Sequence, residues 1–114
     1  MTIDFKDKIA VITFEDSDKI GRPFRDEIKR NYASLSKKNI ILDLRALKPV
    51  LSTHIKNFVE LSAYHRKLYD KSFVVVTGPI ALKLLPADLN VVPTMNEALD
   101  TIEIEEIERD LGFS

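Results

Sequence analysis

The sequence contains no cysteine, which excludes disulfide bonds, thiolate zinc sites and cysteine nucleophiles. Its three glycines, Gly21, Gly78 and Gly112, are too scattered to form a phosphate-binding loop. The two histidines, His54 and His65, lie eleven residues apart in one predicted helix, which separates them by roughly 16 Å. Because there is also no third histidine, the sequence predicts no metal site and no cofactor.

The sequence also lacks a long hydrophobic run and an excess of charge. No apolar segment approaches the ~20 residues needed to cross a bilayer, and no basic stretch leads into an apolar one after Met1. We therefore expect a cytoplasmic protein that does not contact a membrane. The 17 basic residues are balanced by 18 acidic residues, which gives no general attraction to nucleic acid. The length of 114 residues fits one compact domain, 1–114.

Short β-branched runs alternate with amphipathic helical segments along the chain. The predicted strands are residues 2–6, 8–14, 39–44, 72–77 and 90–93. The predicted helices are residues 23–36, 53–69 and 80–85, and a C-terminal helix of about 95–111 that Thr94 and Glu97 begin with a capping-box pattern. The order ββαβαβαβα predicts an α/β fold, an open mixed sheet of four to five strands with helices packed against it.

This order, together with three local segments, resembles the STAS domain of bacterial anti-sigma factor antagonists over nearly the whole chain. The first segment is the strand at 40–44 followed by a loop to Leu51, Ser52, Thr53 and His54; the other two are residues 73–78 and 91–99. In the family, an Asp-Ser-Ser/Thr-Gly signature opens the next helix, and a partner kinase phosphorylates its second hydroxyl. The resemblance implies that role for Thr53, with Ser52 as the lesser candidate.

The resemblance implies a STAS-like domain with no catalytic residues, which acts as a protein-interaction module of a bacterial signalling or partner-switching system that regulates transcription. Its expected protein partner is an anti-sigma factor or a serine/threonine kinase. The expected partner-binding residues surround the helix start: Ser17, Asp18, Arg22, His54, Lys56, Asn57 and Glu60. The alternative is a STAS-like scaffold or oligomerising subunit without a phosphoswitch.

Two departures from the signature and one simpler role keep that alternative open. Leu51 stands where the family has its acidic residue, and His54 stands where it has glycine. Ser52 and Thr53 also have the chemistry of helix caps, a role that needs no phosphorylation. A phosphate at this point would add about −1.5 to −2 charges to the docking surface.

The C-terminal helix carries two apolar faces. The first comprises Ala98, Leu99 and Ile102, and the second comprises Ile104, Ile107 and Leu111. Since the two faces lie about 100° or more apart, either the helix bends near Glu103 to bring both onto the core, or the second face meets a partner or a second copy in a homodimer.

Charge is distributed unevenly between two segments. Residues 19–38 contain seven basic residues against two acidic ones, whereas residues 97–110 contain seven acidic residues against Arg109 alone. These opposite signs allow a head-to-tail contact between two molecules, or the binding of an acidic partner to the basic surface.

Overall fold

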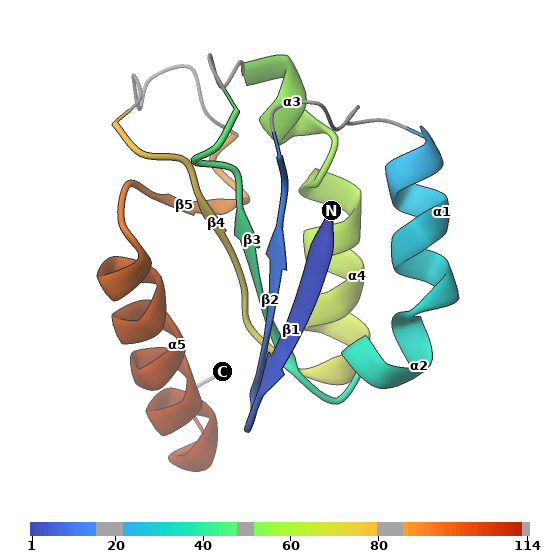
Figure 1. Cartoon of the computed structure of the whole chain (residues 1–114). Coiled ribbons are helices and arrows are strands. Elements are labelled where there is room, and N and C mark those ends of the chain that lie inside the picture. Colours follow the sequence, from blue (N-terminus) through green and yellow to red (C-terminus); the bar gives the residue numbers. More distant parts are fainter. Residues whose placement is uncertain (16–21, 48–51, 80–85, 113–114) are drawn as a thin grey trace.

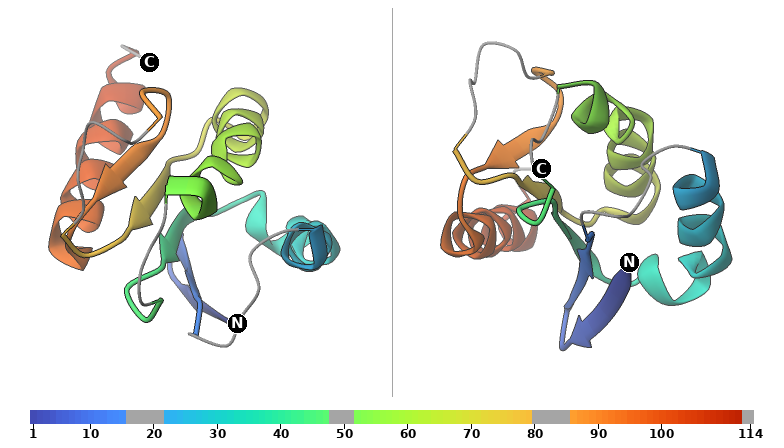
Figure 2. Two further views of the ribbon diagram at one scale, coloured as in Figure 1. Left: turned by 90° about the horizontal axis from the view of Figure 1, so that it is seen from above. Right: turned by 45° about the horizontal axis from the view of Figure 1, so that its top comes forward.

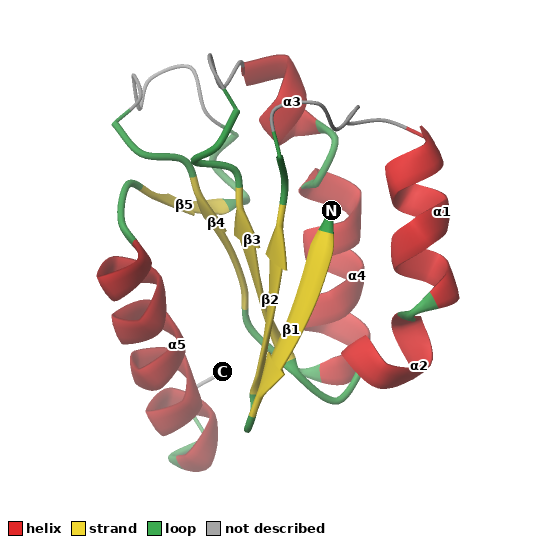
Figure 3. Ribbon diagram, viewed as in Figure 1, coloured by secondary structure: helices red, strands yellow, loops and turns green. Residues whose placement is uncertain are grey.

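The computed structural model describes residues 1–15, 22–47, 52–79 and 86–112 (Figure 1). The strands are β1 Thr2–Lys6, β2 Ile9–Thr13, β3 Asn39–Asp43, β4 Phe73–Val76 and β5 Asn90–Val92. The helices are α1 Arg22–Arg30, α2 Tyr32–Leu35, α3 Ser52–Lys56, α4 Val59–Tyr69 and α5 Met95–Asp110 (Figure 3). The predicted helix at 80–85 lies outside the described residues. None of the helices in this part of the chain combines the length and the hydrophobicity of a membrane-spanning segment.

The five strands form one mixed sheet in the order β1-β2-β3-β4-β5, which confirms the predicted fold class. β1 and β2 form an antiparallel hairpin in which Ile3 lies opposite Ile12. Asp7, in the turn of this hairpin, has a φ of 50°, a left-handed conformation that aspartate tolerates better than most residues. β2, β3, β4 and β5 are parallel to one another, so each of these neighbours is reached through a crossover.

Helices cover both faces of the sheet, and among the helices that the structure describes α5 is the only one on its face (Figure 2). The larger core lies under α1 to α4 and includes Ile40 and Leu42 of β3. The smaller core lies under α5, where Ala98 and Ile102 pack with Ile41 and with residues of β4. The alternation of β3 side chains between the two cores explains why this strand reads as a continuous apolar run.

Two of the predicted helices are each divided by a short break. The first divides at Asn31, whose side-chain Nδ2 donates a hydrogen bond to the Glu27 carbonyl over 2.9 Å. The second divides after Lys56, so the predicted continuous helix at 53–69 is wrong. At this break the amides of Asn57 and Phe58 bond to carbonyls three residues back, over 3.3 and 3.0 Å, which is the geometry of a tighter helical turn.

α5 is one continuous helix, and Thr94 caps its start as the sequence predicts. Thr94 Oγ accepts a hydrogen bond from the Glu97 amide over 3.2 Å and donates one to the Glu97 carboxylate over 2.9 Å. Leu99 is 42% exposed, so the expectation that it packs with Ala98 and Ile102 is wrong. The reason is that α5 lies over the β3 to β5 side of the sheet, which leaves Leu99 beside an open groove with Val11.

A buried asparagine joins α5 to the start of two strands. Asn39, fully buried, donates to Glu106 Oε1 over 2.8 Å and accepts from the Ser72 amide over 2.8 Å. Arg109 adds hydrogen bonds to Asn39 Oδ1 and Ser72 Oγ over 3.3 and 3.2 Å. The hydrogen bond from Asn39 lowers the pKa of Glu106, and although burial opposes this, the nearby cations of Lys8, Arg109 and Lys71 add to it.

His65 is fully buried, and both of its ring nitrogens are engaged. Nε2 lies 2.7 Å from the Lys38 carbonyl, and Nδ1 lies 2.7 Å from the Tyr32 hydroxyl. Since a carbonyl can only accept, Nε2 carries the proton, and the neutral ring accepts from Tyr32 at Nδ1. Burial lowers the pKa of His65; the hydrogen bond to Lys38 opposes this, and the charge of Lys71 lowers the pKa further.

The burial of His65 predicts a pH-dependent stability. Because the folded protein holds the pKa of His65 below its value of about 6.5 in the unfolded chain, the unfolded state binds more protons as the pH falls from about 6.5. The free energy of unfolding should then fall by up to about 1.4 kcal/mol per pH unit until the folded pKa is reached. Urea unfolding of wild type and His65→Gln at pH 7.5 to 5 should show this slope only in wild type.

The second histidine supplies the control for this measurement. His54 is not fully buried, and His54→Gln should keep the wild-type slope. A wild-type slope that persists in His65→Gln and disappears in His54→Gln would contradict the assignment.

Candidate functional site

The carboxyl ends of β2, β3, β4 and β5 meet at one edge of the sheet, because these strands are parallel. α3 lies at the same end of the molecule, at the top of Figure 1. Open α/β sheets bind their ligands and partners at this edge, where loops rather than paired strands present side chains. We call the described part of this edge, Asp43 to Arg45 together with α3, the strand-end surface.

An ion pair fixes the chain where β3 ends. Arg45 donates to Asp43 from Nε and Nη2, each over 2.9 Å, and its backbone amide donates to Asp43 Oδ1 over 3.1 Å. Burial raises the pKa of Asp43, but the hydrogen bonds and charge of Arg45 outweigh it and leave the pKa below its usual range. The ionised pair therefore holds the first residues of the segment that leads to α3.

Thr53, the residue predicted to be modified, is exposed in the first turn of α3. The side chain of Asn57, the residue that follows α3, donates a hydrogen bond to the Thr53 carbonyl over 2.8 Å. This bond links the first turn of this short helix to the residue after its end. α3 begins at Ser52, so Thr53 lies within the helix rather than before it, and the side chain of Ser52 lies outside the described residues. The structure thus presents the Thr53 side chain to solvent at the strand-end surface.

Three phenylalanines anchor the break between α3 and α4. Phe58 packs edge-on against Phe24 of α1, with ring centroids 5.2 Å apart, and Phe24 packs against Phe14 at 4.4 Å. All three rings are buried. Aromatic pairs of this geometry contribute about 0.5–1.5 kcal/mol beyond the area they bury. The cluster ties the strand-end surface to α1 and to the end of β2.

The four predicted partner-binding residues whose side chains the structure describes divide into two groups. His54 and Lys56 belong to α3 and lie next to Thr53, whereas Asn57 and Glu60 line a groove between α1, α2 and α4. Three other predicted residues fall wholly or partly outside the description: Ser17, Asp18 and the side chain of Arg22, whose backbone begins α1.

The groove between α1, α2 and α4 contains residues that the sequence analysis did not single out. Its volume is about 850 Å³, and we call it the tyrosine groove. Its lining includes Tyr32, Ala33, Leu61, Tyr64 and Tyr69, with Asp26, Lys29, Ser36, Asn57 and Glu60. The three tyrosine rings contact one another, with centroids 5.4 to 5.9 Å apart. Tyr64 and Tyr69, on either side of His65 in the sequence, are the signal from which this groove could have been predicted.

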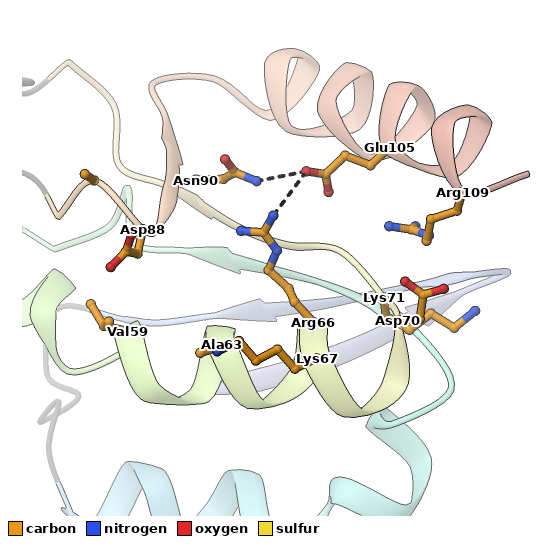
Figure 4. A pocket seen from close by; sticks show the side chains of 11 residues that line it. Val59, Ala63, Arg66, Lys67, Asp70, Lys71, Asp88, Asn90, Glu105 and Arg109 are labelled. Atoms are coloured by element: carbon orange, nitrogen blue, oxygen red, sulfur yellow. Dashed lines mark hydrogen bonds and ion pairs between the residues drawn. The ribbon is translucent and has the colours of Figure 1, made fainter. Parts of the chain in front are cut away.

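A second groove, of about 780 Å³, lies between α4 and α5 beside β5 (Figure 4). Glu105 reaches into it and accepts a hydrogen bond from Asn90 over 3.2 Å, while Arg66 approaches the same oxygen to 3.9 Å. Arg109, also in the lining, is bound to Asn39 and Ser72. Glu105 therefore joins α5 to β5 through Asn90 and to α4 through Arg66.

The Asp43–Arg45 pair should be measurable as a local contribution to stability. Arg45→Ala should lower the free energy of unfolding at pH 7 by about 1 kcal/mol, because about half of the arginine side chain is exposed to solvent (48%) and the pair is screened. It should also raise the pKa of Asp43 in an NMR titration, and the stability difference should vanish as the pH falls through that pKa. Arg66→Ala, which removes the longer ion pair to Glu105, should change stability less; an equal loss would contradict the special role of Arg45.

No protein-family model matches the chain, and no curated protein matches it. Among solved structures, the chain is similar to one described as the molecular architecture of the stressosome, a signal integration and transduction hub. The two superpose with a TM-score of 0.68 at 21% identity, over 90% of this chain and 96% of that chain. This likeness and the five-stranded mixed sheet show that the chain has a STAS-like α/β fold.

Proposed function

We propose that the chain is a non-catalytic protein-interaction module of a bacterial signalling assembly in the cytoplasm, regulated by phosphorylation at Thr53. The observation that carries this proposal is the position of Thr53, exposed in the first turn of α3 on the strand-end surface. The likeness in fold to a chain of a signal-integration hub supports a role in signalling. The proposed partner is an anti-sigma factor or a serine/threonine kinase, whose binding would control transcription.

The chemistry of Thr53 supports the proposed switch. A phosphate carries about −1.5 to −2 charges at neutral pH and three strong acceptor oxygens, so it changes both the shape and the potential of a small surface. The neighbouring side chain of Lys56 is exposed and would belong to the partner-binding surface. Addition of a phosphate here would weaken the binding of a partner that docks on the unmodified helix through an apolar or acidic surface.

The second candidate function is a STAS-like scaffold without a phosphoswitch. One observation favours it: α5 exposes Ile104, Ile107 and Leu111, which are 56%, 52% and 63% exposed, on the face of the sheet opposite α3. An apolar face of this kind on a surface helix is typical of an interaction site.

The switch is tested by affinity capture from native lysate with tagged wild type, Thr53→Ala and Thr53→Glu, and by mapping phosphates on the recovered chain. Wild type and Thr53→Ala should recover the same partner, and Thr53→Glu should recover at least about tenfold less, a loss of about 1.4 kcal/mol. Phosphate should be found on Thr53 of the wild type.

Ser34→Glu is the matched control, because Ser34 is an exposed hydroxyl residue of α2 at the other end of the molecule (Figure 1). This variant should recover the partner as wild type does. Equal recovery by Thr53→Glu and wild type, with no phosphate on Thr53, would overturn the switch and leave the scaffold function.

A further inference from the structure

The outward face of α5 has an apolar stripe with only acidic charge around it. Ile104, Ile107 and Leu111, the α5 stripe, are spaced as i, i+3 and i+7, the spacing of helices that dock into grooves. Its exposed charged neighbours on the helix are Glu97, Asp100, Glu103, Glu108 and Asp110. The one cation of the helix, Arg109, is turned inward, where it bonds to Asn39 and Ser72.

The charges around the stripe decide what kind of surface can cover it. α5 contains seven acidic residues and one basic residue, a formal charge of −6. Two α5 stripes packed face to face would bring these carboxylates together, which is unfavourable. The stripe therefore requires an apolar surface with basic residues around it.

The tyrosine groove has apolar walls, and the segment along one side of it has a net positive charge. The rings of Tyr32, Tyr64 and Tyr69, with Leu61 and Ala33, give it apolar walls. Residues 26–38, which form one side of it, contain four basic and two acidic residues, a formal charge of +2. Lys29 lines the groove directly, as do the acidic Asp26 and Glu60, and the exposed Arg30 and Lys37 lie on the same segment as Lys29.

The two surfaces belong to opposite faces of the sheet, so they cannot meet within one molecule (Figure 2). We propose that the α5 stripe of one molecule docks in the tyrosine groove of a second copy of this chain. The contact joins two different surfaces, so it is heterologous, and each added molecule leaves one stripe and one groove free. This inference deepens the proposed function, because it names a second copy as one partner of the module.

The proposal predicts self-association that depends on concentration and salt. In sedimentation velocity, the weight-average mass of the purified wild type should rise with protein concentration at about 0.02 M salt and fall towards that of the monomer at about 0.5 M salt, because screening weakens the attraction between the basic and acidic surfaces. A wild type that stays monomeric up to about 1 mM at low salt, where even a Kd of that size would show, would overturn the proposal.

Two variants distinguish a heterologous contact from a symmetric one. Ile107→Asp places a charge in the stripe, and Ala33→Glu places a charge and extra volume in the groove; both positions are exposed, so the fold should be retained. Each variant alone retains one intact surface but has no intact complement, and its self-association should weaken at least about tenfold. An equimolar mixture should form a heterodimer through the intact stripe of Ala33→Glu and the intact groove of Ile107→Asp, and nothing larger.

Controls keep each outcome decisive. Leu99→Asp adds the same charge to the same helix away from the stripe, and it should self-associate as wild type does. Circular dichroism of every variant checks the fold. A mixture that remains monomeric, or an Ala33→Glu variant that still self-associates like wild type, would contradict the heterologous contact. The sedimentation experiment contains only this chain, so failure of the self-association does not affect the Thr53 capture experiment. Loss of the Thr53 switch likewise does not affect the sedimentation result.

Discussion

The burial of β3 and β4 on both faces is the constraint on which the rest of the structure depends. Every residue of β3 and every residue of β4 is buried. Strands of this kind are stable only between two layers, so the chain must supply helices for both faces of the sheet. Of the described helices, α1 to α4 form one layer and α5 forms the other, which makes α5 indispensable although its buried apolar contribution comes mainly from Ala98 and Ile102.

A single helix with so small an apolar contact needs another means of fixing its position, and Asn39 provides it. Asn39 begins β3, and its amide group is hydrogen-bonded on both sides, to Glu106 of α5 and to the Ser72 amide before β4. A buried amide that lost these partners would cost about 1–3 kcal/mol, so positions of α5 that break the network are disfavoured. The same network turns Arg109 inward, which leaves the exposed face of α5 with acidic charge alone.

Local patterns in the sequence predict much of this fold. The apolar run at 39–44 predicts β3, and Thr94 with Glu97 predicts the start of α5, because both signals involve neighbours in the chain. The break after Lys56 was missed because its cause is tertiary: Phe58 packs against Phe24 and Phe14, far away in the sequence. Local apolar spacing cannot reveal such a contact.

The candidate site shows the same division between local and distant information. The position of Thr53 at a helix start follows from the residues around it and from the resemblance to STAS domains. The tyrosine groove does not follow from local patterns, because Tyr32 and His65 are 33 residues apart and meet only when α2 packs beside α4. The exposure of Leu99 was also unpredictable, since it depends on which strands α5 covers.

The strand-end surface and the tyrosine groove meet at Asn57. Its side chain holds the carbonyl of Thr53, and the same residue lines the tyrosine groove together with Glu60. A phosphate on Thr53 would place about −1.5 to −2 charges one helical turn from this end of the groove. If the groove receives the acidic α5 of a second copy, that added charge repels the incoming helix. Phosphorylation and self-association would then oppose each other through electrostatics alone, without a change of fold.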